Sequence, residues 1–152
     1  MSYAEDTIVP EERSRYEIET LVQKHGGKEF GYMSSAKEAV IVFRMDGYSV
    51  RFRVPLPDPD SNEFQLTPTG RRRRNLEVMT DAYYQERRRR WRSLALVIKA
   101  KLEAIGTGIT TFQEEFLAHF ILEGGRTVGE EIVPQLEAAK QTGKLPRALL
   151  NL

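Results

Sequence analysis

The fold is decided by the stretch from Arg71 to Ile105, which reads RRRRNLEVMTDAYYQERRRRWRSLALVIKAKLEAI. Residues that favour helix dominate it, and neither Gly nor Pro occurs between Asn75 and Ile105. At 100° per residue its apolar side chains fall on one helical face. That face consists of Leu76, Tyr83, Tyr84, Trp91, Leu94, Ile98, Leu102 and Ile105. The pattern predicts one long helix over residues 72–105.

Arg87 interrupts this apolar stripe one turn before Trp91. Either the helix breaks between Tyr84 and Arg90, or Arg87 lays its methylenes on the core and sends its guanidinium to a partner. We favour the unbroken helix, which would be roughly 45 Å long. A globule of 152 residues is about 38 Å across, so such a helix must kink, protrude or find a partner. We therefore expect a homo-oligomer, a two-fold homodimer with Trp91 near the contact.

The residues before the long helix predict a first helix and then a β-meander. Pro10, with two glutamates after it, opens a helix over residues 9–25. Three extended segments follow in residues 29–56, and Asp46-Gly47 predicts a two-residue hairpin turn between the last two. In the last segment apolar and polar side chains alternate, so one sheet face should be buried and the other basic. The buried set is Val50, Phe52, Val54 and Leu56, and the basic set is Arg51 and Arg53.

Shorter elements flank the long helix. A Pro-rich loop over residues 57–70 holds Phe64 and Leu66, which predict a brief edge strand as a possible fourth strand. Residues 110–143 predict a helix-turn-helix whose helices begin with capping boxes. Three aromatic side chains at four-residue spacing are expected in the core; they are Phe112, Phe116 and Phe120.

The tail, residues 144–152, is rich in leucine and should dock on the body or in an oligomer contact. Its leucines are Leu145, Leu149, Leu150 and Leu152. The chain as a whole, residues 1–152, predicts a single α+β domain. A small antiparallel sheet of three to four strands is packed by an N-terminal helix and the long Arg-rich central helix, with two shorter helices at the C-terminus.

Composition excludes several functional classes. The absence of cysteine excludes disulfides, thiolate catalysis and Cys-ligated zinc. No apolar run is long enough for a signal peptide or a membrane span, so we expect a soluble cytoplasmic protein. No phosphate-cradling or dinucleotide-binding motif occurs. His119 with Glu115 and Glu123 resembles half a metal site but lacks a second histidine or cysteine. We expect no metal, no cofactor and no enzymatic activity.

Charge is distributed unevenly along the chain. Between Arg71 and Arg92 nine arginines face three acidic residues, a net charge of +6, whereas the whole chain carries only +1. The remainder is therefore acidic. Arginine forks onto phosphate or carboxylate and stacks on bases, which a lysine ammonium cannot do. The Arg-rich segment is thus a candidate for binding an anionic partner.

Four segments resemble a family of small uncharacterised proteins carried by bacteriophages and by integrated elements of bacteria. They are Arg90-Trp91-Arg92, Ile98–Ala104, Phe112–His119 and Gly125–Val128. The resemblance implies a genetic context in a bacterial host, and it assigns no activity and no site residues.

Three functions fit these observations. In the first, a non-enzymatic phage or mobile-element protein binds nucleic acid through its Arg-rich helix and basic sheet face, with Tyr83, Tyr84 and Trp91 available to stack on bases. The candidate contacts are Arg51, Arg53, Arg71, Arg72, Arg73, Arg74, Arg88, Arg89 and Arg92. In the second, an interaction module or inhibitor acts on the acidic surface of a host defence factor. In the third, the arginines meet acidic residues across a homodimer.

Overall fold

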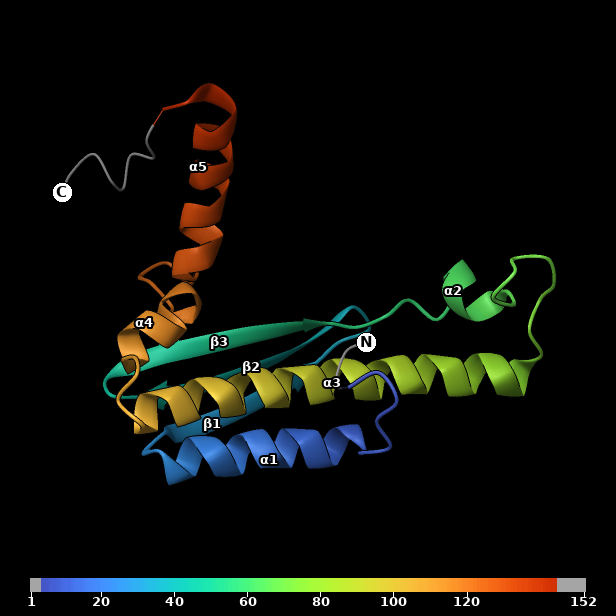
Figure 1. Ribbon diagram of the computed structural model, residues 1–152, viewed down its shortest axis with the longest axis horizontal. Helices are drawn as coiled ribbons and strands as arrows, with labels where there is room; N and C mark the ends of the chain where they lie inside the picture. Colours follow the sequence, from blue (N-terminus) through green and yellow to red (C-terminus); the bar gives the residue numbers. More distant parts are fainter. Residues whose placement is uncertain (1–3, 145–152) are drawn as a thin grey trace.

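A computed structural model describes residues 4–144. It is an α+β fold in which α1 (Glu11–Lys24) and the long helix α3 (Leu76–Gly106) lie side by side along one face of a three-stranded antiparallel sheet (Figure 1). The core forms between these layers, from apolar side chains of both helices and of one sheet face. The predicted α+β class is confirmed.

The sheet has the order β1 (Lys28–Ser34), β2 (Glu38–Met45), β3 (Tyr48–Pro55). Asp46 and Gly47 both have positive φ, 52° and 81°, as the predicted hairpin turn requires. The turn sets the β2–β3 register, which brings inward-facing apolar side chains of the two strands together. These pairs are Ala39 with Val54, Ile41 with Phe52, and Phe43 with Val50.

The described residues contain three strands, so a fourth strand is not seen. Phe64 lies instead in a one-turn helix, α2 (Asn62–Gln65), because the Ser61 side chain accepts a hydrogen bond from the amide of Glu63 and starts a helical turn there. Leu66 forms only an isolated bridge with Arg73. The edge-strand prediction is therefore wrong.

Helix α3 is unbroken, as expected, but begins at Leu76 rather than at residue 72. Asn75 caps it by accepting a hydrogen bond from the amide of Val78 (2.9 Å). From Trp91 onward the predicted apolar face packs into the core. Trp91 itself is fully buried, so its ring cannot touch a second copy directly. Leu76 is 73% exposed, because the first turns of α3 extend beyond the sheet (Figure 1).

The C-terminal elements are α4 (Phe112–Phe116), a 3₁₀ turn η1 (Leu117–His119) and α5 (Val128–Thr142). All three phenylalanines of the predicted row are buried. Thr127 and Glu130 form the predicted capping box, and Gly143 ends α5 in the left-handed conformation. Helix α5 has no buried side chain and projects from the body (Figure 1). The leucine-rich tail, residues 145–152, lies outside the described residues.

Candidate nucleic-acid interface

The two sheet arginines are bound to acidic side chains. Arg51 Nη2 lies 3.0 Å from Glu130 Oε2, and Arg53 Nε lies 3.1 Å from Glu130 Oε1. Arg53 also donates to Glu38 (2.6 Å). The side chain of Arg51 is only 16% exposed. The expected basic sheet face is therefore largely neutralised, because the first turn of α5 brings Glu130 to it.

Glu130 joins the α5 cap to the sheet. It accepts a hydrogen bond from the amide of Thr127 (3.0 Å) in addition to those from the two arginines. The Thr127 amide and the guanidinium of Arg53 hold the pKa of Glu130 at about 2, below its ordinary value of 4.5. The carboxylate is thus ionised whenever the protein is at neutral pH.

Arg87 also has a carboxylate partner. Its Nε and Nη2 donate to the two oxygens of Glu11 at 3.0 and 2.9 Å, and its Nη1 donates to the Tyr83 hydroxyl at 3.2 Å. The hydrogen bonds that Arg87 donates to Glu11 raise the pKa of Arg87 above its ordinary value despite partial burial. Of the two alternatives for this residue, the unbroken helix with a partner for the guanidinium is confirmed, and the partner is α1.

Three other arginines of α3 also bind carboxylates. Arg89 and Arg90 both donate to Glu86 Oε1, at 2.8 and 2.9 Å. Burial would raise the pKa of Glu86, but the hydrogen bonds from Arg89 and Arg90 outweigh it and lower that pKa. Arg92, one of the candidate contacts, pairs with Glu17 of α1, and its side chain is only 21% exposed. Together we call Arg87, Arg88, Arg89, Arg90 and Arg92 the α3 arginine cluster.

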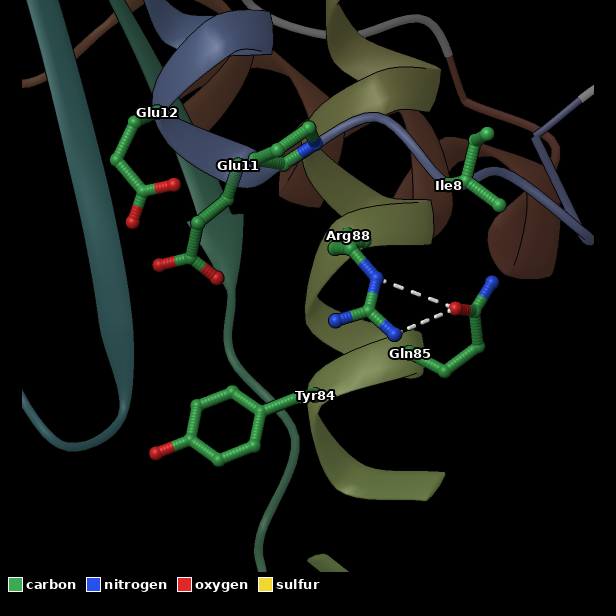
Figure 2. Close-up of a pocket in the computed structure, with 7 residues that line it drawn as sticks. Ile8, Glu11, Glu12, Tyr84, Gln85 and Arg88 are labelled. Atoms are coloured by element: carbon green, nitrogen blue, oxygen red, sulfur yellow. Dashed lines mark hydrogen bonds between the residues drawn. The ribbon is translucent and has the colours of Figure 1, made fainter. Parts of the chain in front are cut away.

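Within this cluster Arg88 differs from its neighbours. Its guanidinium donates to the side-chain oxygen of Gln85, at 2.7 Å from Nη2 (Figure 2). Gln85 is neutral and is itself held by the carbonyls of Glu5 and Thr7. Among the described residues Arg88 forms no ion pair, so its charge remains available to a partner.

The run from Arg71 to Arg74, here called the arginine loop, has a different environment. Arg71, Arg72 and Arg73 are exposed, and Arg74 is half-buried. In residues 4–144 none of the four forms an ion pair; the side chain of Arg73 reaches only the neutral Gln65, at 3.4 Å. The loop precedes α3 and is not helical, which corrects the prediction that the long helix includes Arg72.

Backbone hydrogen bonds fix the path of the loop. The amide of Thr67 donates to the carbonyl of Arg72 (2.8 Å), and the amide of Arg74 donates to the carbonyl of Gln65 (2.7 Å). Gly70, with φ of 72°, turns the chain between these bonds. The four guanidinium groups therefore extend from an ordered turn.

An open groove lies between β3 and α3. Its cavity of about 600 Å³ is lined by both apolar and charged side chains. The charged ones are Arg53, Arg89, Arg90 and Glu86, and the apolar ones include Pro55, Leu94 and Val97. The groove brings together two of the predicted contacts, Arg53 and Arg89, but it does not include the arginine loop.

The histidine considered as half a metal site has a structural environment. The His119 ring stacks on Phe52 with ring centroids 3.9 Å apart. Burial, and then the nearby charge of Lys101, lower the pKa of His119. Lys101 also engages Glu115 (3.2 Å). No group of three His, Asp or Glu side chains in residues 4–144 is placed to hold a metal ion.

Sequence reasoning identified the arginines but missed the carboxylates that bind them. Glu11 and Glu17 were assigned only to a helix, and Glu130 only to a capping box. Their partners lie 75 to 79 residues away in the sequence. No local pattern signals such contacts.

No protein-family model, curated protein or solved structure matches the chain. None of the helices in the part of the chain that the structure describes has the length and apolarity needed to cross a membrane. Function must therefore be argued from the chemistry of the side chains described above.

Proposed function

We propose that this chain is a non-enzymatic accessory protein of a bacteriophage or mobile element that binds nucleic acid in the cytoplasm of its bacterial host. The contact is the arginine loop. One observation carries the proposal: four consecutive guanidinium groups have no carboxylate partner among residues 4–144, while most of the other candidate arginines have one.

Free guanidinium groups on an ordered turn suit the nucleic-acid backbone. Each presents N–H donors in a planar fork that matches two phosphate oxygens. Binding releases the counterions condensed on the phosphates, which supplies affinity without reading sequence. We therefore expect binding to be strong at low salt and indifferent to base sequence.

The structure narrows the set of contacts. Arg51, Arg53, Arg89 and Arg92 would have to leave Glu130, Glu86 or Glu17 before they could bind phosphate. That exchange costs much of what the new contact contributes. Trp91 is fully buried and cannot stack on a base. The proposed contact set is Arg71, Arg72, Arg73 and Arg74.

A second candidate function is binding to an acidic surface of a host protein. It is favoured by Leu76 and Val78, which follow the loop directly and are 73% and 47% exposed. Apolar side chains beside arginines are typical of protein interfaces, whereas a phosphate backbone offers them no partner.

The test is a salt titration of oligonucleotide binding by fluorescence anisotropy. The wild type should show a linear fall of log K with log salt, of slope about −0.7 per phosphate on single strands and about −0.9 on duplex. Replacing Arg71, Arg72 and Arg73 with alanine should reduce the magnitude of the slope by about 2 to 3 and weaken binding to all sequences alike.

A matched control removes the same charge elsewhere. Lys99, Lys140 and Lys144 are exposed lysines on other parts of the molecule. Their triple alanine variant should keep the wild-type slope. The proposal fails if the wild type does not bind at 50 mM salt, or if both triple variants lose binding equally. In the first case the acidic protein surface becomes the next candidate to test.

A further inference from the structure

The part of α3 that extends beyond the sheet has an uncovered apolar stripe. We call residues 76–88 the α3 overhang. On the core face of α3, Trp91 and Ile98 are fully buried. The same helical face continues toward the N-terminus through Tyr84, which is 49% exposed, and Leu76, which is 73% exposed. The face that packs the core thus continues into solvent.

Within residues 4–144 the overhang is covered by α2 and, near its C-terminal end, by the segment before α1, to which Gln85 is hydrogen-bonded. Phe64 of α2 is buried and meets the Tyr83 ring edge-on, with centroids 5.7 Å apart. Figure 1 shows α2 above this part of α3 and no helix or strand below it. The side that carries Tyr84 and Leu76 is the open one.

The two ends of the stripe carry opposite charges, so one copy of the stripe can complement another. Glu77 and Asp81 lie near its beginning, are exposed, and form no ion pair in residues 4–144. Arg88, bound only to a neutral glutamine, lies at its end. In an antiparallel pair of these helices, the acidic end of one copy lies against the Arg88 end of the other, so the opposite charges attract. The two carboxylates also disfavour nucleic acid as the occupant of this face.

A cavity lies beside the basic end of the stripe. It measures about 330 Å³ and is lined by Ile8, Pro10 and Tyr84, by Gln85 and Arg88, and by the carboxylates of Glu11 and Glu12, of which Glu11 is already paired with Arg87 (Figure 2). Ile8 is 89% exposed, so the cavity has an apolar side without a partner. If two overhangs cross antiparallel about a point between Ala82 and Tyr83, Glu77 of each stands opposite Arg88 of the other. Leu76 then falls beside this cavity.

We propose that a second copy of this chain covers the overhang. The two helices cross antiparallel about a two-fold axis near Ala82, Leu76 of each copy enters the cavity beside Tyr84 of the other, and Glu77 pairs with Arg88 across the contact. This interface replaces the one expected at Trp91. It does not depend on nucleic-acid binding, because the arginine loop is outside it.

The test is the mass in solution, measured by sedimentation equilibrium between about 1 and 100 μM. The wild type should approach twice the 17.5 kDa of one chain. Leu76→Glu should give a monomer, since it places a charge in the apolar contact that Leu76 makes beside Tyr84 of the other copy. Leu76 is exposed in the single chain, so circular dichroism should show an unchanged fold. Ile109→Glu, at an apolar site that is 81% exposed elsewhere, is the matched control and should remain a dimer.

A charge exchange makes the test specific. Glu77→Arg and Arg88→Glu should each weaken the dimer at least tenfold by placing like charges opposite each other. The double variant should recover the wild-type dissociation constant to within a few-fold. The proposal is overturned if the wild type is a monomer at 100 μM, if Ile109→Glu dissociates the dimer and Leu76→Glu does not, or if the double variant fails to recover.

Discussion

Two runs of four consecutive arginines, Arg71–Arg74 and Arg87–Arg90, have opposite environments in this molecule. In the second run, Arg87, Arg89 and Arg90 bind carboxylates of Glu11 and Glu86. The first run has no such partner among residues 4–144. Two basic runs of the same length in a sequence can thus differ in how many of their charges the fold pairs with acids.

The difference has a simple structural origin. The second run lies where α1 and α3 pack side by side, and α1 supplies Glu11 and Glu17. Glu86 lies one helical turn before Arg89 and Arg90. The arginine loop precedes the helix at the end of the molecule that extends beyond the sheet. Among residues 4–144, the unpaired arginines of the segment from Arg71 to Arg92 are therefore the four of the arginine loop and Arg88.

The largest expected effect concerns the aromatic ring among the paired arginines. Trp91→Ala should cost about 3 to 5 kcal/mol in the free energy of unfolding, because it removes a fully buried ring from the core. Tyr84→Ala, one turn into the overhang and half exposed, should cost far less in the isolated chain. Urea denaturation followed by circular dichroism measures both. Equal losses would show that the overhang is as tightly packed as the core.

The next effect concerns the pair between Arg87 and Glu11. Arg87→Leu should destabilise the protein by about 2 kcal/mol, because it leaves a mostly buried carboxylate without its partner. Arg71→Leu, in the unpaired run, should change the free energy of unfolding by less than about 0.5 kcal/mol. Thermal melts of the two variants sharpen the comparison. A variant Arg87→Leu as stable as the wild type would mean that the side chain only rests on the core.

A pH titration tests the sheet arginines. The pKa of Glu130 is held at about 2, below its value of 4.5 when unfolded, so its contribution to stability is complete above pH 4.5 and lost as pH falls toward 2. Glu130→Gln should therefore remove part of the acid dependence in that window. Urea midpoints measured between pH 2 and 5 report it. Parallel curves for wild type and variant would contradict the proposed role of Glu130.

The variant Glu130→Gln also tests whether pairing with a carboxylate is what keeps an arginine from binding phosphate. Glu130→Gln releases Arg51 and weakens the hold on Arg53. If free guanidinium groups bind phosphate and paired ones do not, the salt slope of oligonucleotide binding should become steeper than in the wild type. An unchanged slope would confine binding to the arginine loop.

Much of the fold could be predicted because its signals are local. Asp46-Gly47 set the hairpin, and the absence of Gly and Pro from residue 76 to 105 set the long helix. The edge strand was misjudged because Ser61 starts a helical turn that captures Phe64. Leu76 was placed on the apolar face correctly, but periodicity gives the direction of a side chain and not what lies opposite. Leu76 is exposed because α3 continues past the end of the sheet (Figure 1), and the sequence does not show where the sheet ends.

The sequence predicted which residue types make up the candidate site, but not which of them pair with one another. The arginines could be counted from the sequence, and so could the acidic remainder. Which arginine meets which acid depends on contacts such as Arg51 with Glu130, 79 residues apart. Such pairs are fixed by the docking of α1 on α3 and of α5 on the sheet. A single sequence without homologues carries no signal for them.

The most direct test of the account is the accessibility of each guanidinium group in the native protein. Reaction with phenylglyoxal, followed by digestion at glutamate and mass spectrometry, gives a rate for each arginine-containing peptide. The account predicts that Arg71, Arg72 and Arg73 react first, and that Arg51, Arg87 and Arg92 react at the rate of unfolding or not at all. Equal rates for the arginine loop and for the paired arginines Arg87, Arg89, Arg90 and Arg92 would contradict it.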